Sequence, residues 1–107
     1  MPDHRVHWTD AARLDLQEIV SFVAFDSPEN ARKILQRLKR WCSNLARFPG
    51  RGRLVPELKA IDVLTYHELI EAPWRIVYRF DANRVYVMAV LDARRNLTGL
   101  LLERLAR

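Results

Sequence analysis

The chain has 107 residues, half of them hydrophobic and 29% charged, which is typical of one globular domain and excludes a disordered chain. Its net charge of +5 favours an anionic partner, either nucleic acid or an acidic protein segment. Cys42 is the single cysteine, which excludes an internal disulfide and a cysteine-based metal site. Without a signal peptide or an apolar run of membrane-spanning length, residues 1–107 are expected to form one cytoplasmic domain with no metal, cofactor or membrane contact.

The first part of the chain predicts a strand followed by two helices. His4 to Trp8 alternates in polarity and is expected to be an edge strand. Apolar residues then recur at helical spacing from Asp10 to about Phe25, and again from Pro28 to about Leu45. Thr9 and Ser27 precede these two stretches and are good N-cap residues. Because the break between the helices is short, they should form an antiparallel hairpin.

The second part predicts a three-stranded meander and a short helix. Tyr66 to Glu71, Trp74 to Phe80 and Val85 to Leu91 alternate in polarity, and turn residues separate the last two. Asn96 can cap a final helix that ends near Leu105. Together the elements predict an α+β fold: an N-terminal strand, an antiparallel helical hairpin packed on an antiparallel sheet whose last three strands form a meander, and a short C-terminal helix.

The register of the last two strands decides which side chains face the helices. If Phe80 pairs with Val85, unbroken pairing places Leu91 opposite Trp74 on the covered face of the sheet. Arg75 and Arg79 then lie on the second face. We expect that face to stay uncovered, so that both guanidinium groups are exposed.

Several short strings occur in a fixed order: Asp15-Leu16-x-Glu18-Ile19, Asp26-Ser27-Pro28-x-x-Ala31, Leu45-x-x-Phe48-Pro49-x-x-Gly52-Arg53, Val55-Pro56-Glu57-Leu58, Tyr66-x-Glu68-Leu69, Trp74-Arg75-Ile76-Val77-Tyr78-Arg79 and Val90-Leu91-Asp92-x-Arg94-Arg95-Asn96-Leu97. In order and spacing they resemble the RelE/ParE toxin superfamily of bacterial type II toxin–antitoxin systems. The resemblance covers nearly the whole chain, from about Val6 to Leu105.

The resemblance implies one of two activities. Members similar to RelE cut messenger RNA on the ribosome without a metal, whereas members similar to ParE poison DNA gyrase and are not known as nucleases. Both kinds are silenced by an antitoxin that wraps the toxin, which implies a hetero-oligomer. The long helical hairpin and the leucine-rich segment after the last strand look more like ParE. We therefore predict a non-catalytic gyrase poison, with a RelE-like mRNA endonuclease as the alternative. A plain nucleic-acid-binding domain is a third interpretation, but the sequence contains no helix-turn-helix or other DNA-recognition motif that would support it.

The resemblance suggests site residues for the nuclease and for target binding, and the basic charge and apolar residues of the chain suggest a third set for the antitoxin. For the nuclease alternative they are Glu57, Arg75, Arg79 and Tyr86, with His67 as a further candidate because no His or Tyr follows the last strand. For target binding they are Arg75, Arg79, Asp92, Arg94 and Arg95. For the antitoxin, an acidic amphipathic helix is expected to dock on apolar ridges formed by Leu16, Val20, Leu38, Trp41 and Leu101.

Overall fold

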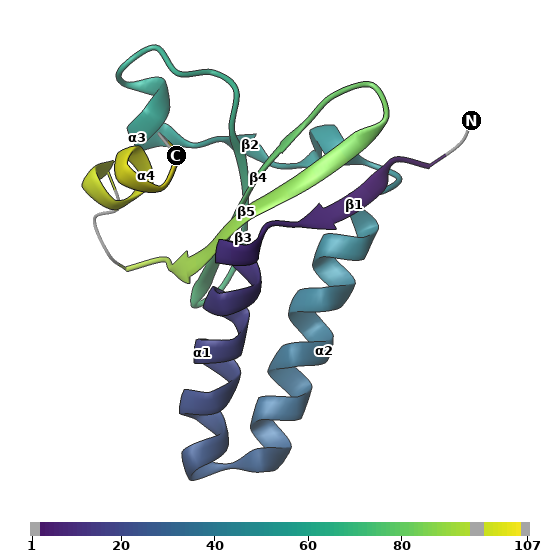
Figure 1. The fold of residues 1–107 in the computed structure, drawn as a ribbon, viewed down its shortest axis with the longest axis vertical. Helices are drawn as coiled ribbons and strands as arrows, with labels where there is room; N and C mark the ends of the chain where they lie inside the picture. Colours follow the sequence, from purple (N-terminus) through teal and green to yellow (C-terminus); the bar gives the residue numbers. More distant parts are fainter. Residues whose placement is uncertain (1–2, 95–97, 106–107) are drawn as a thin grey trace.

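A helical hairpin projects from a five-stranded sheet in the computed structural model, which describes residues 3–94 and 98–105 (Figure 1). The predicted α+β order is confirmed, while β2, the 3-10 helix η1 and α3 were not predicted. None of the described helices is long and apolar enough to cross a membrane. The elements are β1 (Arg5–Trp8), α1 (Asp10–Asp26), α2 (Pro28–Asn44), η1 (Pro49–Arg51), β2 (Arg53–Leu54), α3 (Pro56–Lys59), β3 (His67–Glu71), β4 (Trp74–Phe80), β5 (Arg84–Asp92) and α4 (Thr98–Leu105).

The strands lie in the order β1-β5-β4-β3-β2. The meander of β3, β4 and β5 is antiparallel, as predicted, and β2 adds an antiparallel edge to β3. β1 runs parallel to β5, so the sheet is mixed and not wholly antiparallel. The parallel pairing is possible because the helical hairpin and the strands β2, β3 and β4 lie between β1 and β5 in the sequence.

Local hydrogen bonds fix the ends of the helical hairpin. Thr9 caps α1, as predicted, and also donates its hydroxyl to the Val87 carbonyl at 3.0 Å, which ties the helix start to β5. Ser27 ends one helix and begins the next. Its backbone N–H donates to the Val23 carbonyl at 2.9 Å, while its hydroxyl accepts from the Asn30 N–H at 3.2 Å. The predicted cap at Asn96 lies outside the described residues.

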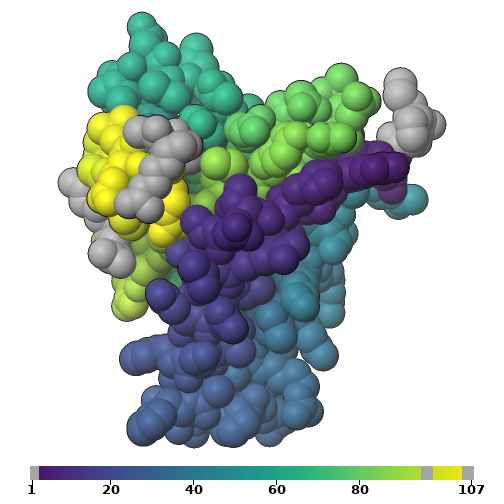
Figure 2. All heavy atoms as spheres, in the orientation of Figure 1, coloured from purple at the N-terminus to yellow at the C-terminus, as the bar shows by residue number. Residues whose placement is uncertain are grey.

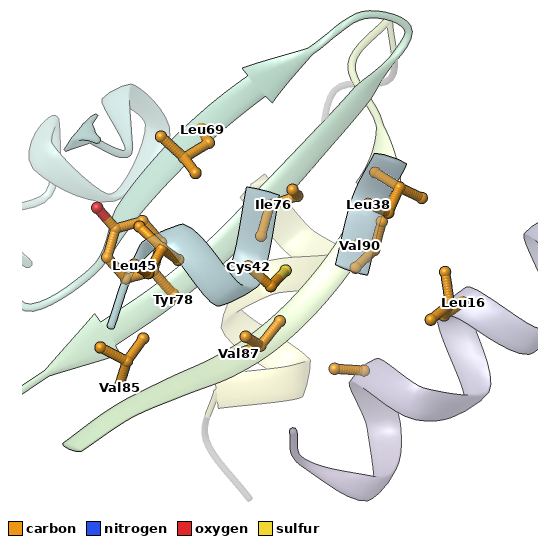
Figure 3. Close-up of a cluster of buried hydrophobic side chains, with 11 residues drawn as sticks. Leu16, Leu38, Cys42, Leu45, Leu69, Ile76, Tyr78, Val85, Val87 and Val90 are labelled. Carbon is orange, nitrogen blue, oxygen red and sulfur yellow. The ribbon is translucent and has the colours of Figure 1, made fainter. Parts of the chain in front are cut away.

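The main core lies between the hairpin and one face of the sheet (Figure 3). Tyr78 is fully buried there, and its hydroxyl accepts from the Gly52 N–H at 2.8 Å and donates to the Pro49 carbonyl at 2.6 Å. This pair of bonds holds the loop before β2 against the sheet. Burial raises the pKa of the Cys42 thiol to about 12, so the thiol is inert at neutral pH. The labelled members are Leu16, Leu38, Cys42, Leu45, Leu69, Ile76, Tyr78, Val85, Val87 and Val90.

The predicted register of β4 and β5 holds only near their turn. Tyr78 lies opposite Val87 as expected, and a β-bulge then shifts the pairing by one residue. Beyond the bulge Ile76 lies opposite Val90, and the predicted pairing of Ile76 with Ala89 is wrong. Since neighbouring side chains alternate between faces, the shift turns Val90 toward the hairpin and its two neighbours away from it.

The second face of the sheet is therefore apolar in its middle and is covered. Leu91 lies opposite Arg75 and not opposite Trp74, so it joins a second buried cluster on this face. The expectation of an open second face is wrong here, because α3 and α4 close it. These two short helices lie next to each other, away from the hairpin (Figures 1 and 2). The buried members are Val55, Leu58, Val77, Ala89, Leu91 and Leu101.

Gly52→Ala should destabilise the fold by about 1–3 kcal/mol, because the added methyl group overpacks a filled site. Its Cβ would lie 2.5 Å from the Glu68 carbonyl oxygen and 2.6 Å from the Tyr78 hydroxyl. The control is Gly50→Ala, since a Cβ there meets no atom within 4 Å. Urea unfolding of both variants should separate them, and equal midpoints would contradict the tight approach of this loop to β3 and β4.

Leu101→Ala should lower the free energy of unfolding by about 2–5 kcal/mol, because it leaves a cavity in the second cluster. Leu101 is fully buried, whereas the adjacent Leu102 is 43% exposed. Leu102→Ala is therefore the matched control, with the same chemical change in the same helix. Thermal unfolding measures both. If the two variants lose the same stability, α4 is not docked on the sheet.

Candidate functional site

A closed network of two arginines and two glutamates lies on the second face of the sheet. Arg75 projects from β4 and Glu68 from the neighbouring β3, while α3 supplies Glu57. The Arg75 guanidinium donates to both oxygens of Glu57, at 2.5 and 2.8 Å, and its Nε donates to Glu68 Oε1 at 2.8 Å. Its Nη2 also contacts Glu68 Oε1. The second oxygen of Glu68 accepts from Arg53 of β2 at 2.8 Å. The network thus joins β2, β3, β4 and α3.

Burial makes this network strong. Arg75 is 5% exposed and Glu68 is 1% exposed, so neither charge would be tolerated there without its partners. The hydrogen bonds from Arg75 hold the pKa of Glu57 below its ordinary value. In return, Glu57 and then Glu68 raise the pKa of Arg75 above its ordinary range, against the opposing effect of burial. Glu57 and Arg75 therefore stay charged at neutral pH.

This geometry corrects the predicted exposure of Arg75. Its three nitrogens make four hydrogen bonds to carboxylate oxygens, so the guanidinium does not present a free fork to a phosphate. Periodicity alone placed Arg75 on the second face but did not reveal that Glu57 would fold over it. Glu68 was noted only as part of a string. The sequence could have indicated this role, because the strand expected to pair with β4 places Glu68 on the same face as Arg75.

The other two nuclease candidates form a separate pair. The Arg79 guanidinium lies 4.0 Å from the centre of the Tyr86 ring, and the two residues face each other across β4 and β5. Tyr86 also stacks on His7 of β1. His67 packs against Tyr78 and so lies on the hairpin side of the sheet, away from both pairs. The structure therefore divides the predicted nuclease residues into two groups.

A family comparison decides the class of protein. The family described as "ParE toxin of type II toxin-antitoxin system, parDE" matches residues 6–97. The chain belongs to this family. The predicted membership of the RelE/ParE superfamily is thereby confirmed, and the protein is a type II toxin of that superfamily.

The relatives of this ParE-family toxin carry names of both classes. Toxin RelE2 of Caulobacter vibrioides is 30% identical over 92 residues, which are 85% of this chain and 97% of the relative. A chain of the chromosomal ParDE TA system from P. aeruginosa shares the fold with a TM-score of 0.69 and 21% identity, covering 85% of this chain and 97% of that one. A chain of the toxin–antitoxin complex RelBE2 from Mycobacterium tuberculosis has a TM-score of 0.62 and 22% identity, covering 86% and 93%.

The predicted target-binding residues of the ParE-family toxin are not gathered in one place. Asp92 ends β5 and accepts two hydrogen bonds from the exposed Arg94 guanidinium, at 2.8 and 3.1 Å. Arg75 is sealed in the network, and Arg79 lies beside Tyr86. Arg95 lies outside the described residues. Within residues 3–94 and 98–105, no three His, Cys, Asp or Glu side chains converge as a metal site.

The residues predicted to bind an antitoxin are mostly internal. Leu38 and Leu101 are fully buried within the chain, which corrects their assignment to a partner surface, whereas Leu16 keeps 8% of its surface exposed. Val20 and Trp41 are half-buried. Leu16 and Val20 line a groove of 640 Å³ along the helical hairpin, which is apolar inside and basic at its rim and which the residue pattern did not reveal. It is lined by Trp8, Arg13, Leu16, Gln17, Val20, Ser21, Leu35 and Lys39.

Glu57→Gln should make the toxin less stable at neutral pH, and this deficit should shrink in acid. The pKa of Glu57 is lowered in the folded state, so its contribution is full above the ordinary value of 4.5 and is lost as the pH falls through the lower folded value. Urea unfolding of the wild type and the variant between about pH 3 and pH 7 measures the gap.

The control for this titration is Glu29→Gln. Glu29 is an exposed carboxylate of α2, 3.7 Å from Lys33, and such surface pairs contribute little to stability. Its gap from the wild type should be small throughout. A Glu57→Gln deficit that stays constant down to the acid end would show that the ion pair with Arg75 does not stabilise the fold.

Proposed function

We propose that this ParE-family toxin arrests growth by binding and poisoning DNA gyrase, and that it does not cut RNA. The closed Arg75 network is the observation that carries the proposal. A metal-independent ribonuclease needs a base to take a proton from the 2′-hydroxyl and cations to stabilise the phosphate in flight. In this chain the candidate base, Glu57, and the candidate cation, Arg75, are bound to each other.

The energetics of opening the pair argue in the same direction. Both Glu57 oxygens accept from Arg75, and the lowered pKa of Glu57 makes it a weaker base than a free carboxylate. Separating a buried ion pair costs about 3–5 kcal/mol, and such a cost would slow a chemical step by about a hundred-fold or more. Binding a target through the surface of the protein does not require Glu57 and Arg75 to separate, so it carries no such cost.

The alternative remains a RelE-like, ribosome-dependent mRNA endonuclease. It is favoured by the Arg79–Tyr86 pair, which lies outside the closed network and offers a cation beside a phenol. The relative named Toxin RelE2 supports the same alternative. Because both targets are cytoplasmic, the toxin would act in the cytoplasm in either case.

We further propose that a cognate antitoxin neutralises the toxin by occupying the groove along the helical hairpin. Trp8 and Leu35 give the groove an apolar floor, while Arg13 and Lys39 add positive charge. An acidic amphipathic helix fits both properties, since its apolar face can enter the groove and its carboxylates can meet the basic rim. The solved relatives, which come from ParDE and RelBE2 toxin–antitoxin systems, support such a partner.

Two assays with the purified toxin separate the two targets. We expect inhibition of DNA supercoiling by gyrase with accumulation of cleaved DNA, and no cutting of messenger RNA on translating ribosomes. Arg94→Ala should weaken gyrase inhibition by about ten-fold, the loss expected for one charge-assisted contact. Arg40→Ala removes an equally accessible arginine from the outer face of α2 and should leave inhibition unchanged.

The reverse pattern would overturn the proposal. Messenger RNA cut on ribosomes, with gyrase untouched, would establish the RelE-like alternative. Inhibition that Arg94→Ala and Arg40→Ala affect equally would place the gyrase contact elsewhere than at the end of β5.

A further inference from the structure

A stack of three side chains crosses one end of the second sheet face. His7 of β1 lies opposite Tyr86 of β5, which in turn lies opposite Arg79 of β4. The His7 and Tyr86 rings are 5.7 Å apart at an interplanar angle of 24°, and the Arg79 guanidinium lies 4.0 Å from the Tyr86 ring centre. The three groups thus form a layered row of flat side chains across three strands.

Two further arginines lie beside this stack on the same face. Arg5 and Arg84 are opposite each other, two residues before His7 and Tyr86 in their strands, and both are exposed. Side chains two residues apart on a strand lie on the same face, so Arg84 lies beside Tyr86 and Arg5 lies beside His7. Stack and arginines therefore form one continuous patch.

Two acidic side chains lie near the patch. Asp3 and Asp81 line a depression of 570 Å³ together with Arg5 and Arg84. The Asp81 carboxylate accepts from the backbone N–H groups of the β4–β5 turn, including that of Arg84, at 2.9 Å. One oxygen of Asp81 is thereby bound to the turn, and Arg5 and Arg84 are exposed beside the two flat rings.

The end of the sheet at His7 is open for a further layer. β1 is the edge strand, so the sheet ends on the side of the His7 ring that faces away from Tyr86. His7 itself is exposed. β1 and the β4–β5 hairpin also extend to the end of the molecule away from α4 (Figure 2). A flat group could therefore continue the stack without displacing any described element.

We propose that this patch binds single-stranded nucleic acid, with an unpaired base stacked on the outer face of His7 and its phosphates on Arg5 and Arg84. Bases stack on aromatic side chains in a way that tolerates any sequence, and arginines follow the backbone charge. An acidic peptide would satisfy the arginines but would leave the stack unused. The inference goes beyond gyrase binding, because it uses neither Arg94 nor the closed Arg75 network.

DNA and RNA share this chemistry, so the test uses both. Fluorescence anisotropy of the 107-residue toxin with labelled oligo-deoxythymidine, oligo-uridine and a duplex of equal length measures the affinities. We expect both single strands to bind more tightly than the duplex. His7→Ala should weaken binding by about ten-fold through loss of one stacked base, and His7→Phe should restore it.

The salt dependence tests the phosphate contacts separately. Arg5→Ala with Arg84→Ala should reduce the slope of log affinity against log salt by about 1.4, since each phosphate contact on a single strand contributes about 0.7. Arg32→Ala with Arg40→Ala is the matched control on the outer face of α2 and should leave the slope unchanged.

Three results would overturn the inference: no binding of either single strand, binding of the duplex with equal affinity, or His7→Ala behaving like the α2 control. A preference for oligo-uridine or oligo-deoxythymidine would support it and identify the natural ligand as RNA or DNA. Gyrase inhibition measured on the same His7→Ala protein distinguishes this patch from the gyrase contact, since it should be unaffected.

Discussion

The buried guanidinium of Arg75 constrains the second face of the sheet more than any other group. A charge this far from water needs carboxylate partners, and one of them, Glu68, comes from the adjacent strand. The other, Glu57, arrives only when α3 folds across the face. That movement also brings Val55 and Leu58 onto the apolar centre of the sheet. The ion pairs and the second core therefore form together, and the loss of one would weaken the other.

The β-bulge divides β5 into two halves with different roles. Near the turn, alternation keeps Tyr86 on the second face, where it remains accessible beside Arg79. Beyond the bulge, the shifted register presents Ala89 and Leu91 to α3 and α4. One inserted residue thus separates an open, cationic end of the face from a closed, apolar end.

Local signals made most of the fold predictable, whereas the site depended on contacts between distant segments. Thr9 and Ser27 indicated where the helices begin, because an N-cap side chain bonds to a backbone N–H only a few residues away. The bulge left no trace in the pattern, since the residues from Val87 to Leu91 are all apolar and suit either register. Arg75 looked exposed because its partner Glu57 lies 18 residues earlier, in a segment for which no helix was predicted.

The same electrostatics bear on how this toxin meets an anionic partner. A phosphate approaching Arg75 competes with two carboxylates that already satisfy the guanidinium, and burial strengthens that competition because water does not screen it. At the β1 end of the face, Arg5 and Arg84 are exposed and need no such exchange. An anionic ligand therefore reaches favourable charge there without breaking a buried ion pair. Because α3 and α4 cover the centre of this face, an anionic ligand is expected to bind at the β1 edge. There the rings of His7 and Tyr86 offer stacking contacts that a simple anion would not use.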